Sequence, residues 1–211
     1  MKLSGVPVFV IGANRAPIFL GVVAEFFQEK PEIITQNIYN LSEEEKKSNR
    51  SVQEKVITLA NRKVFEAVKS YGDGKPAIFF GFHSGAIFKG EELACLDTPE
   101  DIKRVLNLVA GNLYTYCAGI SVGVSNGVEI KAFSSELVTV RPEIKALAME
   151  KIYSIVDAIP SAELPLCNLA YRPLTSHYLK DLMDRQDLEV IALKKLLEQA
   201  VKRMLVDVEL L

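Results

Sequence analysis

The stretch from Ala77 to Phe133 constrains the fold of this chain more than any other. It begins with an apolar, strand-like run, passes through the polar residues His83 and Ser84, and then turns helical. Further on, Asn126-Gly127 separates two β-rich runs, and Asn-Gly is a strong hairpin signal because a type I′ turn needs two positive φ angles. Strand, helix and hairpin in this order predict an α/β fold. We expect any chemical centre where the first strand breaks off at His83 and Ser84.

The helix within this stretch has both of its ends marked in the sequence. Thr98 is suited to be the N-cap, Pro99 the first helical residue and Asp101 a first-turn acid, while Gly111 stands where a C′ glycine would. Between these signals, apolar residues recur at helical spacing: Ile102, Val105, Leu106 and Val109. One face of the helix is therefore predicted to be buried against neighbouring strands.

The flanking segments alternate between strand and helix patterns. A first strand is predicted at Val8–Ile11 and a helix at Pro17–Phe27. Ser51 and Glu54 form a capping-box pattern that begins a long helix ending near Gly72. The remaining predictions are an irregular charged segment at Gln28–Arg50, a strand at Leu137–Val140, a helix from Pro142 to Ile159, a loop at Ser161–Pro173, and helices near Thr175–Met183 and Leu188–Leu205.

Length and composition limit the classes of protein to be considered. The chain has 211 residues, which favours one large domain or two small lobes. Because strands and helices alternate with no repeat or separable linker, the prediction is one domain covering 1–211. Its net charge of -2 gives no general attraction to nucleic acid or to an anionic membrane. No segment approaches the length of a membrane-spanning helix. We therefore expect neither nucleic acid nor a membrane as a partner.

The cysteines indicate the redox environment. There are three of them, Cys95, Cys117 and Cys167, with no CxxC motif and no Cys/His cluster. This pattern favours neither a disulfide framework nor a zinc site. The short apolar run that ends at Ile11 is interpreted as a strand and not as a signal peptide. A cytoplasmic or other reducing intracellular location is the expectation.

The turn after the first strand is a candidate anion site. Asn14 and Arg15 lie between this strand and the Pro17 helix, and free N–H groups gather at the start of a helix. Neither a GxGxxG nor a GxxxxGK[ST] pattern occurs in the chain. A Rossmann dinucleotide site and a P-loop are therefore not predicted.

The order of elements resembles that of the Maf family, which is related in fold to the inosine triphosphate pyrophosphatases. The best portion is GEELACLDTPEDIKRVLNLVAG, Gly90 to Gly111, which is similar to the family's segment from a glycine turn through a helix to a terminal glycine. LANRK, ending at Lys63, resembles the family's LAxxKA helix, and VTVRP, containing Arg141, resembles its VxFRPLS stretch. The acidic pair Glu43 and Glu44 is a further supporting match.

The resemblance implies a mixed β-sheet flanked by helices, with two lobes around a central cleft. It also implies hydrolysis of a nucleoside triphosphate to the monophosphate and pyrophosphate with magnesium or manganese, which needs carboxylates for the metal and water and cations for the polyphosphate. The residues it marks are Glu44, Lys63 and His83 for catalysis, Asn14, Arg15, Ser84 and Arg141 for nucleotide binding, and Glu44 for the metal.

Several positions depart from the family pattern. The turn with paired arginines has only Arg15 as a cation, and the central aspartate-threonine falls on His83 and Ser84. The family's lysine-proline falls on Cys95 and Leu96, and its KAGxYGIQG stretch has no counterpart. A neutral imidazole cannot supply the anionic oxygen ligand that magnesium prefers. We therefore expect a nucleotide-type cleft with impaired or absent catalysis, as in a pseudoenzyme.

Two alternatives remain open at this stage. The chain could be an active pyrophosphatase that uses Glu44, His83 and Lys63 in an altered arrangement, with His83 as the base because its unperturbed pKa lies near neutrality. It could instead be an interaction subunit, forming a homodimer or a larger assembly. In that case the C-terminal helix would dock through its apolar residues Leu196, Leu197, Val201 and Leu205.

Overall fold

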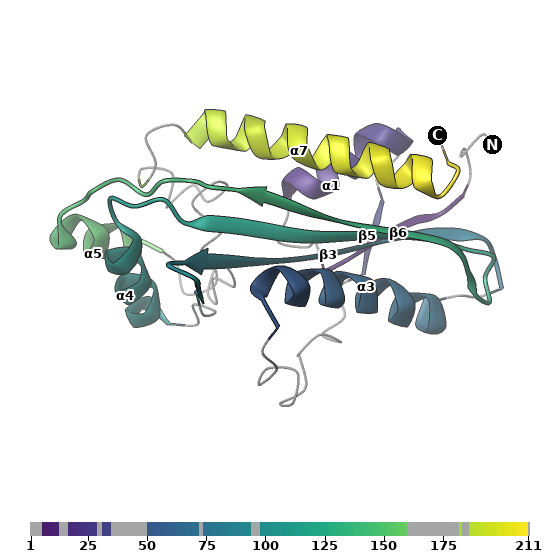
Figure 1. Cartoon of the computed structure of the whole chain (residues 1–211), viewed down its shortest axis with the longest axis horizontal. Helices are drawn as coiled ribbons and strands as arrows, with labels where there is room; N and C mark the ends of the chain where they lie inside the picture. Colours follow the sequence, from purple (N-terminus) through teal and green to yellow (C-terminus); the bar gives the residue numbers. More distant parts are fainter. Residues whose placement is uncertain are drawn as a thin grey trace. The chain divides into compact units, whose positions relative to one another are not determined.

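A computed structural model of the chain describes residues 6–12, 17–28, 31–34, 50–71, 74–93, 98–159, 182 and 186–210. It contains a six-stranded mixed sheet with strand order β2-β1-β3-β5-β6, and β4 pairs with β3 (Figure 1). This confirms the predicted mixed sheet flanked by helices. The strands are β1 (Val8–Ile11), β2 (Glu32–Ile34), β3 (Ala77–Phe88), β4 (Glu91–Glu92), β5 (Thr115–Ser125) and β6 (Ile130–Val140). The described helices are α1 (Pro17–Phe27), α3 (Val52–Tyr71), α4 (Pro99–Val109), α5 (Met149–Asp157) and α7 (Gln186–Asp207).

The chain divides into two compact units. The first unit comprises Met1–His83, Ala118–Val138 and Lys194–Leu211. The second unit comprises Ser84–Cys117 and Thr139–Leu193. The first unit therefore holds β1, β2, α1, α3 and most of α7, and the second holds α4 and α5.

In the first unit, β1 lies between β2 and β3 and runs parallel to both. Phe9 pairs with Glu32 on one side and with Phe79 on the other. The chain leaves β1 toward β2 and returns to β3 on the opposite side, so β1 and β3 flank a topological switch point of the sheet. In open α/β sheets, ligands bind outside the carboxyl ends of the strands at such a point.

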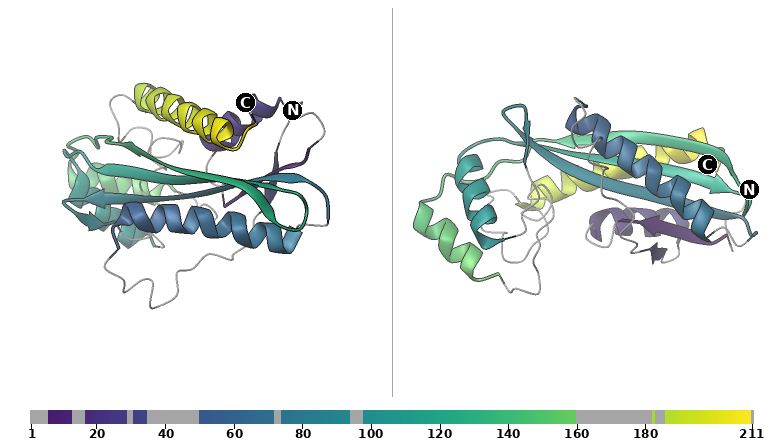
Figure 2. Two further views of the ribbon diagram at one scale, coloured as in Figure 1. Left: turned by 45° about the vertical axis from the view of Figure 1, so that its right-hand side comes forward. Right: turned by 90° about the horizontal axis from the view of Figure 1, so that it is seen from below.

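Helices cover both faces of the sheet in the first unit. Helix α3 lies on one face, and α1 and α7 lie on the other (Figures 1 and 2). Helix α1 packs through Phe19, whose ring stacks on that of Phe82 with centroids 4.8 Å apart. On the α3 side, Val64 and Ala67 join a buried cluster that includes Phe79. The core is therefore built from apolar side chains on both faces of the sheet.

Three glycines let α3 lie unusually close to the strands. A Cβ atom added to Gly81 of β3 would lie 2.2 Å from the carbonyl oxygen of Ala60. One added to Gly119 of β5 would lie 2.4 Å from the carbonyl oxygen of Val56. A Cβ atom added to Gly123, also in β5, would lie 2.5 Å from a side-chain carbon of Val64. At Gly81 and Gly119 the backbone of α3 thus occupies space that any other residue would fill, and at Gly123 the side chain of Val64 does so.

The predicted start of α3 and both predicted ends of α4 are confirmed. The Glu54 amide donates to Ser51 Oγ over 3.2 Å, and the Ser51 amide donates to Glu54 Oε2 over 2.8 Å, which completes the capping box at the start of α3. In the second unit, the Asp101 amide donates to Thr98 Oγ1 over 3.1 Å. Gly111 follows α4 with φ +71°, the conformation expected of a C′ glycine.

The predicted helix from Pro142 to Ile159 was wrong in its first half. Helix α5 begins only at Met149. Before it, Ile144 is held in extended backbone, because its carbonyl accepts from the Gly111 amide over 2.8 Å and its own amide donates to Asn112 over 3.3 Å. These bonds come from a segment distant in sequence, so the apolar periodicity could not reveal them.

The hairpin at Asn126-Gly127 is present, but its predicted turn type was wrong. Gly127 has φ +95°, whereas Asn126 is not among the residues with positive φ. Asn126 stabilises the turn with its side chain instead, since Oδ1 accepts from the amides of Val128 and Glu129 at 3.1 and 3.0 Å. Two successive positive φ angles occur at Lys89 and Gly90, between β3 and β4.

Other predictions from the sequence also need correction or completion. Strand β3 does not break off at His83 and Ser84 but continues to Phe88. The segment predicted to be irregular contains β2, the short β4 was not predicted, and the expected strand at Leu137–Val140 is the end of β6. The predictions for Ser161–Pro173 and Thr175–Met183 lie outside the described residues, apart from Leu182.

Helix α7 belongs to the core of the first unit. Leu197, Val201 and Leu205 are buried, while Leu196 is 37% exposed. Toward β6, Arg203 binds Glu136 through two N–H···O contacts of 2.7 and 2.5 Å, and Ser134 donates to Asp207 over 2.8 Å. Most of the apolar residues expected to form a docking face are therefore used within the chain. Within the part of the chain described, no helix is both long and apolar enough to cross a membrane.

Candidate functional site

The candidate site lies at the carboxyl end of β1, where β1 and β3 flank the switch point. Ile11 is level with Gly81, so Gly12, Phe82 and His83 are the next residues along the two strands. Helix α3 crosses this region on one face of the sheet and contributes Lys63. The site is thus assembled from three elements of the first unit.

Lys63 is buried and reaches the backbone of β3. Its position on α3 follows from helical spacing, because it shares the inward face with Ala60 and Ala67. Only 4% of the residue is exposed, and Nζ donates to the carbonyl oxygen of Phe82 over 2.6 Å. The aliphatic stem therefore passes through apolar surroundings and delivers an amine to the end of β1.

Gly12 provides the space into which the amine fits. A Cβ atom at this position would lie 2.1 Å from Lys63 Nζ and 3.0 Å from the carbonyl oxygen of Phe82. Gly12 also has φ +76°, which other residues adopt at a cost. The positive φ therefore favours glycine here, and any other residue would also displace the Lys63 amine from its present position.

Burial changes the charge of the two titratable groups. It lowers the pKa of Lys63 to about 7. It also lowers the pKa of His83 to about 3, and the nearby Lys63 adds to that effect. Near neutral pH the amine is then partly protonated and the imidazole is neutral. The arrangement can donate hydrogen bonds to an anion and supply a positive charge when the amine binds a proton.

The described part of the site does not fit a divalent metal. Its polar side chains are an amine and an imidazole, whereas magnesium prefers oxygen ligands. Among the residues that the structure describes, no group of three or more His, Cys, Asp or Glu side chains could hold a metal ion. Glu44, the predicted metal ligand, lies outside this part of the chain.

The structure brings two of the predicted site residues together, Lys63 and His83. Ser84 follows His83 on β3, is buried and belongs to the second unit. Arg141 is exposed directly after β6, also in the second unit. Asn14 and Arg15, like Glu44, lie outside the described residues, as do Cys95 and Cys167.

The sequence did not reveal two parts of the site, the backbone carbonyl of Phe82 and the contact between Gly12 and Lys63. Every residue has a backbone carbonyl, so the residue type does not indicate which carbonyl accepts a hydrogen bond. Gly12 was visible as a turn residue after a strand, which is a usable signal. Its contact with Lys63 depends on how closely α3 approaches the sheet, and that distance is not encoded locally.

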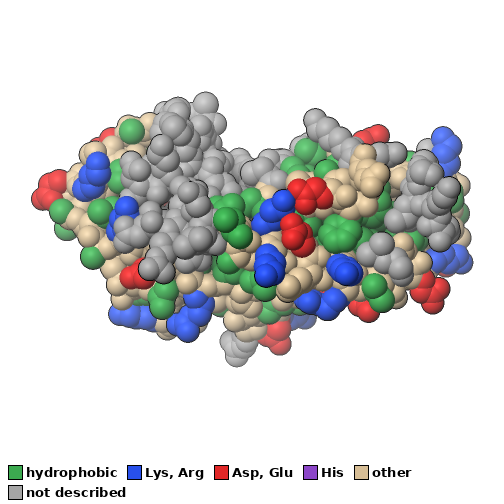
Figure 3. All heavy atoms as spheres, turned by 90° about the horizontal axis from the view of Figure 1, so that it is seen from above, with side chains coloured by type: hydrophobic (Ala, Val, Ile, Leu, Met, Phe, Trp, Pro, Cys, Tyr) green, Lys and Arg blue, Asp and Glu red, His purple; other side chains and the backbone are tan. Residues whose placement is uncertain are grey.

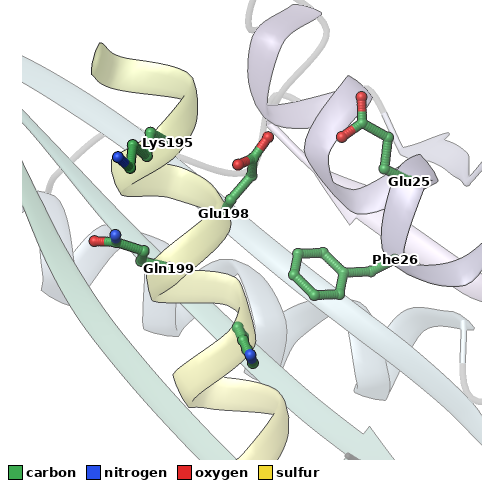
Figure 4. A pocket seen from close by; sticks show the side chains of 6 residues that line it. Glu25, Phe26, Lys195, Glu198 and Gln199 are labelled. Atoms are coloured by element: carbon green, nitrogen blue, oxygen red, sulfur yellow. The ribbon is translucent and has the colours of Figure 1, made fainter. Parts of the chain in front are cut away.

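A hollow lies between α1 and α7, on the face of the sheet away from α3 (Figure 4). It is an open groove of about 480 Å³ lined by Glu25, Phe26, Lys195, Glu198, Gln199 and Lys202. Lys194 at its border contacts Glu25 over 2.7 Å and Glu198 over 3.6 Å. Basic and acidic side chains are interspersed on this face (Figure 3). The groove therefore offers no strong preference for one sign of charge.

Comparison with known proteins gives weak likenesses only. No family model matches the chain, and no curated protein matches it. Among solved structures, the Staphylococcus aureus Ham1 protein is similar with a TM-score of 0.41 and 15% identity, covering 91% of this chain and 98% of that one. A nucleoside-triphosphatase / dITP/XTP pyrophosphatase from Mycobacterium abscessus is similar with a TM-score of 0.38 and 13% identity, covering 67% and 76%. Because these scores and identities are low, we infer the function from the residues of the site.

Proposed function

We propose that the chain is a divergent, Maf-like protein of the inosine triphosphate pyrophosphatase type, with a nucleotide-type site at the carboxyl end of β1 and with impaired or absent catalysis. The observation that carries this proposal is the buried amine of Lys63, aimed at the switch point of the sheet beside His83. The proposed ligand is a nucleoside triphosphate, whose phosphates Lys63 would bind.

The binding part of the proposal rests on position and charge. Lys63 is the lysine of the LANRK segment, which resembles the family's LAxxKA helix, and its amine lies where ligands bind in open α/β sheets. A protonated amine in a largely dehydrated setting attracts phosphate more strongly than one in water. Asn14, Arg15, Ser84 and Arg141 are proposed as further nucleotide contacts.

The catalytic part of the proposal rests on His83. Hydrolysis of a triphosphate needs a base or metal-held water, and an efficient base has a pKa near the working pH. His83 stands where the family has aspartate, and its pKa of about 3 makes it a weak base at neutral pH. Magnesium or manganese would be needed only if activity persists, with Glu44 as its proposed ligand.

Two measurements on the whole chain test the proposal. Calorimetry should show nucleoside triphosphate binding that is lost in Lys63→Met and kept in Lys69→Met, since Lys69 is an exposed lysine on the same helix. Absence of binding by the unaltered protein would remove the nucleotide site from consideration.

Pyrophosphate release from a panel of nucleoside triphosphates, with magnesium or manganese, tests the loss of catalysis. We expect no turnover above the background without protein. Turnover at ordinary enzymatic rates of about 1 per second or more would contradict impaired catalysis. If His83→Ala then abolished it, the active enzyme with Glu44, His83 and Lys63 would be the correct assignment.

A further inference from the structure

We propose that two copies of this chain pair through the outer edges of their β6 strands, antiparallel and about a twofold axis at Ser135. Strand β6 ends the strand order of the sheet, and among the strands that the structure describes it pairs only with β5 (Figure 1). Its outer edge therefore presents backbone N–H and C=O groups that a further strand can bind. The inference does not depend on the proposed nucleotide site.

Strand β6 has few of the features that protect an edge strand from pairing. Natural edge strands are often very short, or carry proline or charged side chains. Strand β6 has 11 residues, none of them proline, and only two are charged. Both charges are paired within the chain, since Lys131 contacts Glu129. The other, Glu136, contacts Arg203. The edge is thus open to a partner strand.

On the α3 face of the sheet, the edge of β6 is apolar. The Phe133 ring stacks on that of Phe65 from α3 with centroids 4.9 Å apart, and Phe65 remains 45% exposed. Leu137 is four residues after Phe133, so it lies on the same face, where it is half-buried. A twofold axis at Ser135 places Phe133 opposite Leu137 of the second copy. Pairing would therefore remove apolar surface of both side chains from water.

On the α7 face, the charges along the edge complement those of a second copy. Glu136 accepts from Arg203 of α7 over 2.7 Å, and Ser134 donates to Asp207 over 2.8 Å. The twofold axis reverses the order of residues, so Ser134 lies opposite Glu136 of the second copy. Arg203 of each copy then lies opposite Asp207 of the other, across the spacing of about 5 Å between paired strands. Both side chains are exposed in a single copy. This complementarity favours a second copy as the partner.

The length of the strand and its charges also favour an axis at Ser135. Ser135 is the middle residue of β6, so this register pairs the whole strand. Neither Lys131 nor Glu136 then lies opposite a like charge. An axis at Glu136 would instead bring two carboxylates together, and like charges directly opposite destabilise a sheet.

Sedimentation velocity of the whole chain, from about 1 to 100 µM, tests the pairing. We expect a dimer whose association is weakened at least about tenfold by Ser135→Lys, because two ammonium groups would then face each other at the axis. Val128→Lys is the matched control. It adds the same charge at a residue that is 81% exposed in the turn before β6, and the dimer should persist. A monomeric unaltered chain, or a dimer unaffected by Ser135→Lys, would overturn the inference.

Ser135→Cys gives a second test that does not rely on the folding of the lysine variant. Residues directly opposite in an antiparallel pair have Cα atoms about 4.5–5.5 Å apart, which a disulfide can span. Mild oxidation should therefore link Ser135→Cys into a covalent dimer on a denaturing gel, and should not link Val128→Cys or the unaltered chain. Equal linking at both positions, or none at Ser135→Cys, would contradict the twofold axis at Ser135.

Discussion

At the scale of single residues, Lys63 affects the stability of the fold as well as the site. Burial lowers its pKa from 10.5 to about 7, so between these values the unfolded chain binds a proton that the folded chain does not. The free energy of unfolding therefore rises with pH across this window. Below about pH 7 both states are protonated, and the folded state carries the full cost of the buried charge.

Replacing Lys63 with Met should remove this pH dependence. The difference in unfolding free energy between the unaltered chain and Lys63→Met should change by up to about 1.4 kcal/mol per pH unit between about pH 7 and 10, with the variant relatively more stable at the acidic end. Urea unfolding across this range measures it. The unfolding free energy of Lys69→Met should change with pH as that of the unaltered chain does. If the unfolding free energy of Lys63→Met changed in the same way, a charged Lys63 would not destabilise the folded state.

Residue type alone revealed part of this site. Lys63 and His83 could be picked from the sequence because lysine and histidine are uncommon within apolar patterns and because they match or depart from the Maf pattern. Their environment could not be derived, since it depends on burial. An unperturbed His83 would be a suitable base, whereas the folded environment makes it a weak one.

At the scale of elements, the packing of α3 on the sheet depends on glycines. Gly119→Ala places a methyl group 2.4 Å from the carbonyl oxygen of Val56, and helix backbone cannot move aside cheaply. We expect a loss of about 1–3 kcal/mol in the free energy of unfolding, measured by urea denaturation.

Gly21→Ala is the matched control for this substitution. Gly21 lies within α1, and a Cβ atom there would meet nothing within 4 Å. Because alanine favours a helix over glycine, this variant should gain about 0.5–1 kcal/mol. A Gly119→Ala variant as stable as the unaltered chain would refute the close approach of α3.

The turn between β3 and β4 should be improved by asparagine. Lys89 has φ +51° and Gly90 has φ +88°, which together suit a type I′ turn. Lysine adopts a positive φ at a cost, and asparagine does so more readily. Lys89→Asn should therefore raise the thermal midpoint, with a gain of about 0.5–1 kcal/mol. A lower midpoint would indicate that losing the contact of Lys89 with the Phe88 ring costs more than asparagine gains at the positive φ.

Elements with local signals were predicted well, and those held by distant partners were not. The capping box of α3 and the caps of α4 depend on residues within one turn, so the sequence contains them in full. The three-residue β2 depends on pairing with β1, and the extended backbone at Ile144 depends on Gly111 and Asn112. Such contacts override local propensity and carry no periodic signal.

At the scale of the whole molecule, the chain passes between its two units only within regular elements. The four crossings fall inside β3, β5, β6 and α7. Domain boundaries usually lie in exposed, flexible linkers. The single domain covering 1–211 therefore stays a prediction, which cooperative unfolding can test.

A single domain should unfold as one cooperative unit. The amides of Val10 in the first unit and Leu106 in the second both belong to fully buried residues. We expect them to lose protection from hydrogen exchange at the same urea concentration. An earlier loss at Leu106 would show that the second unit unfolds separately and would contradict the single domain.

The glycines beneath α3 also have a consequence for the chemistry at the end of β1. Gly81 faces Ala60 on the helix, less than one turn before Lys63. A methyl group placed there would touch neither ligand nor amine, yet it would lift the helix and draw the lysine away from its carbonyl. The position of Lys63 thus depends in part on strand glycines, which have no Cβ atom. A search for reactive side chains would not select these positions.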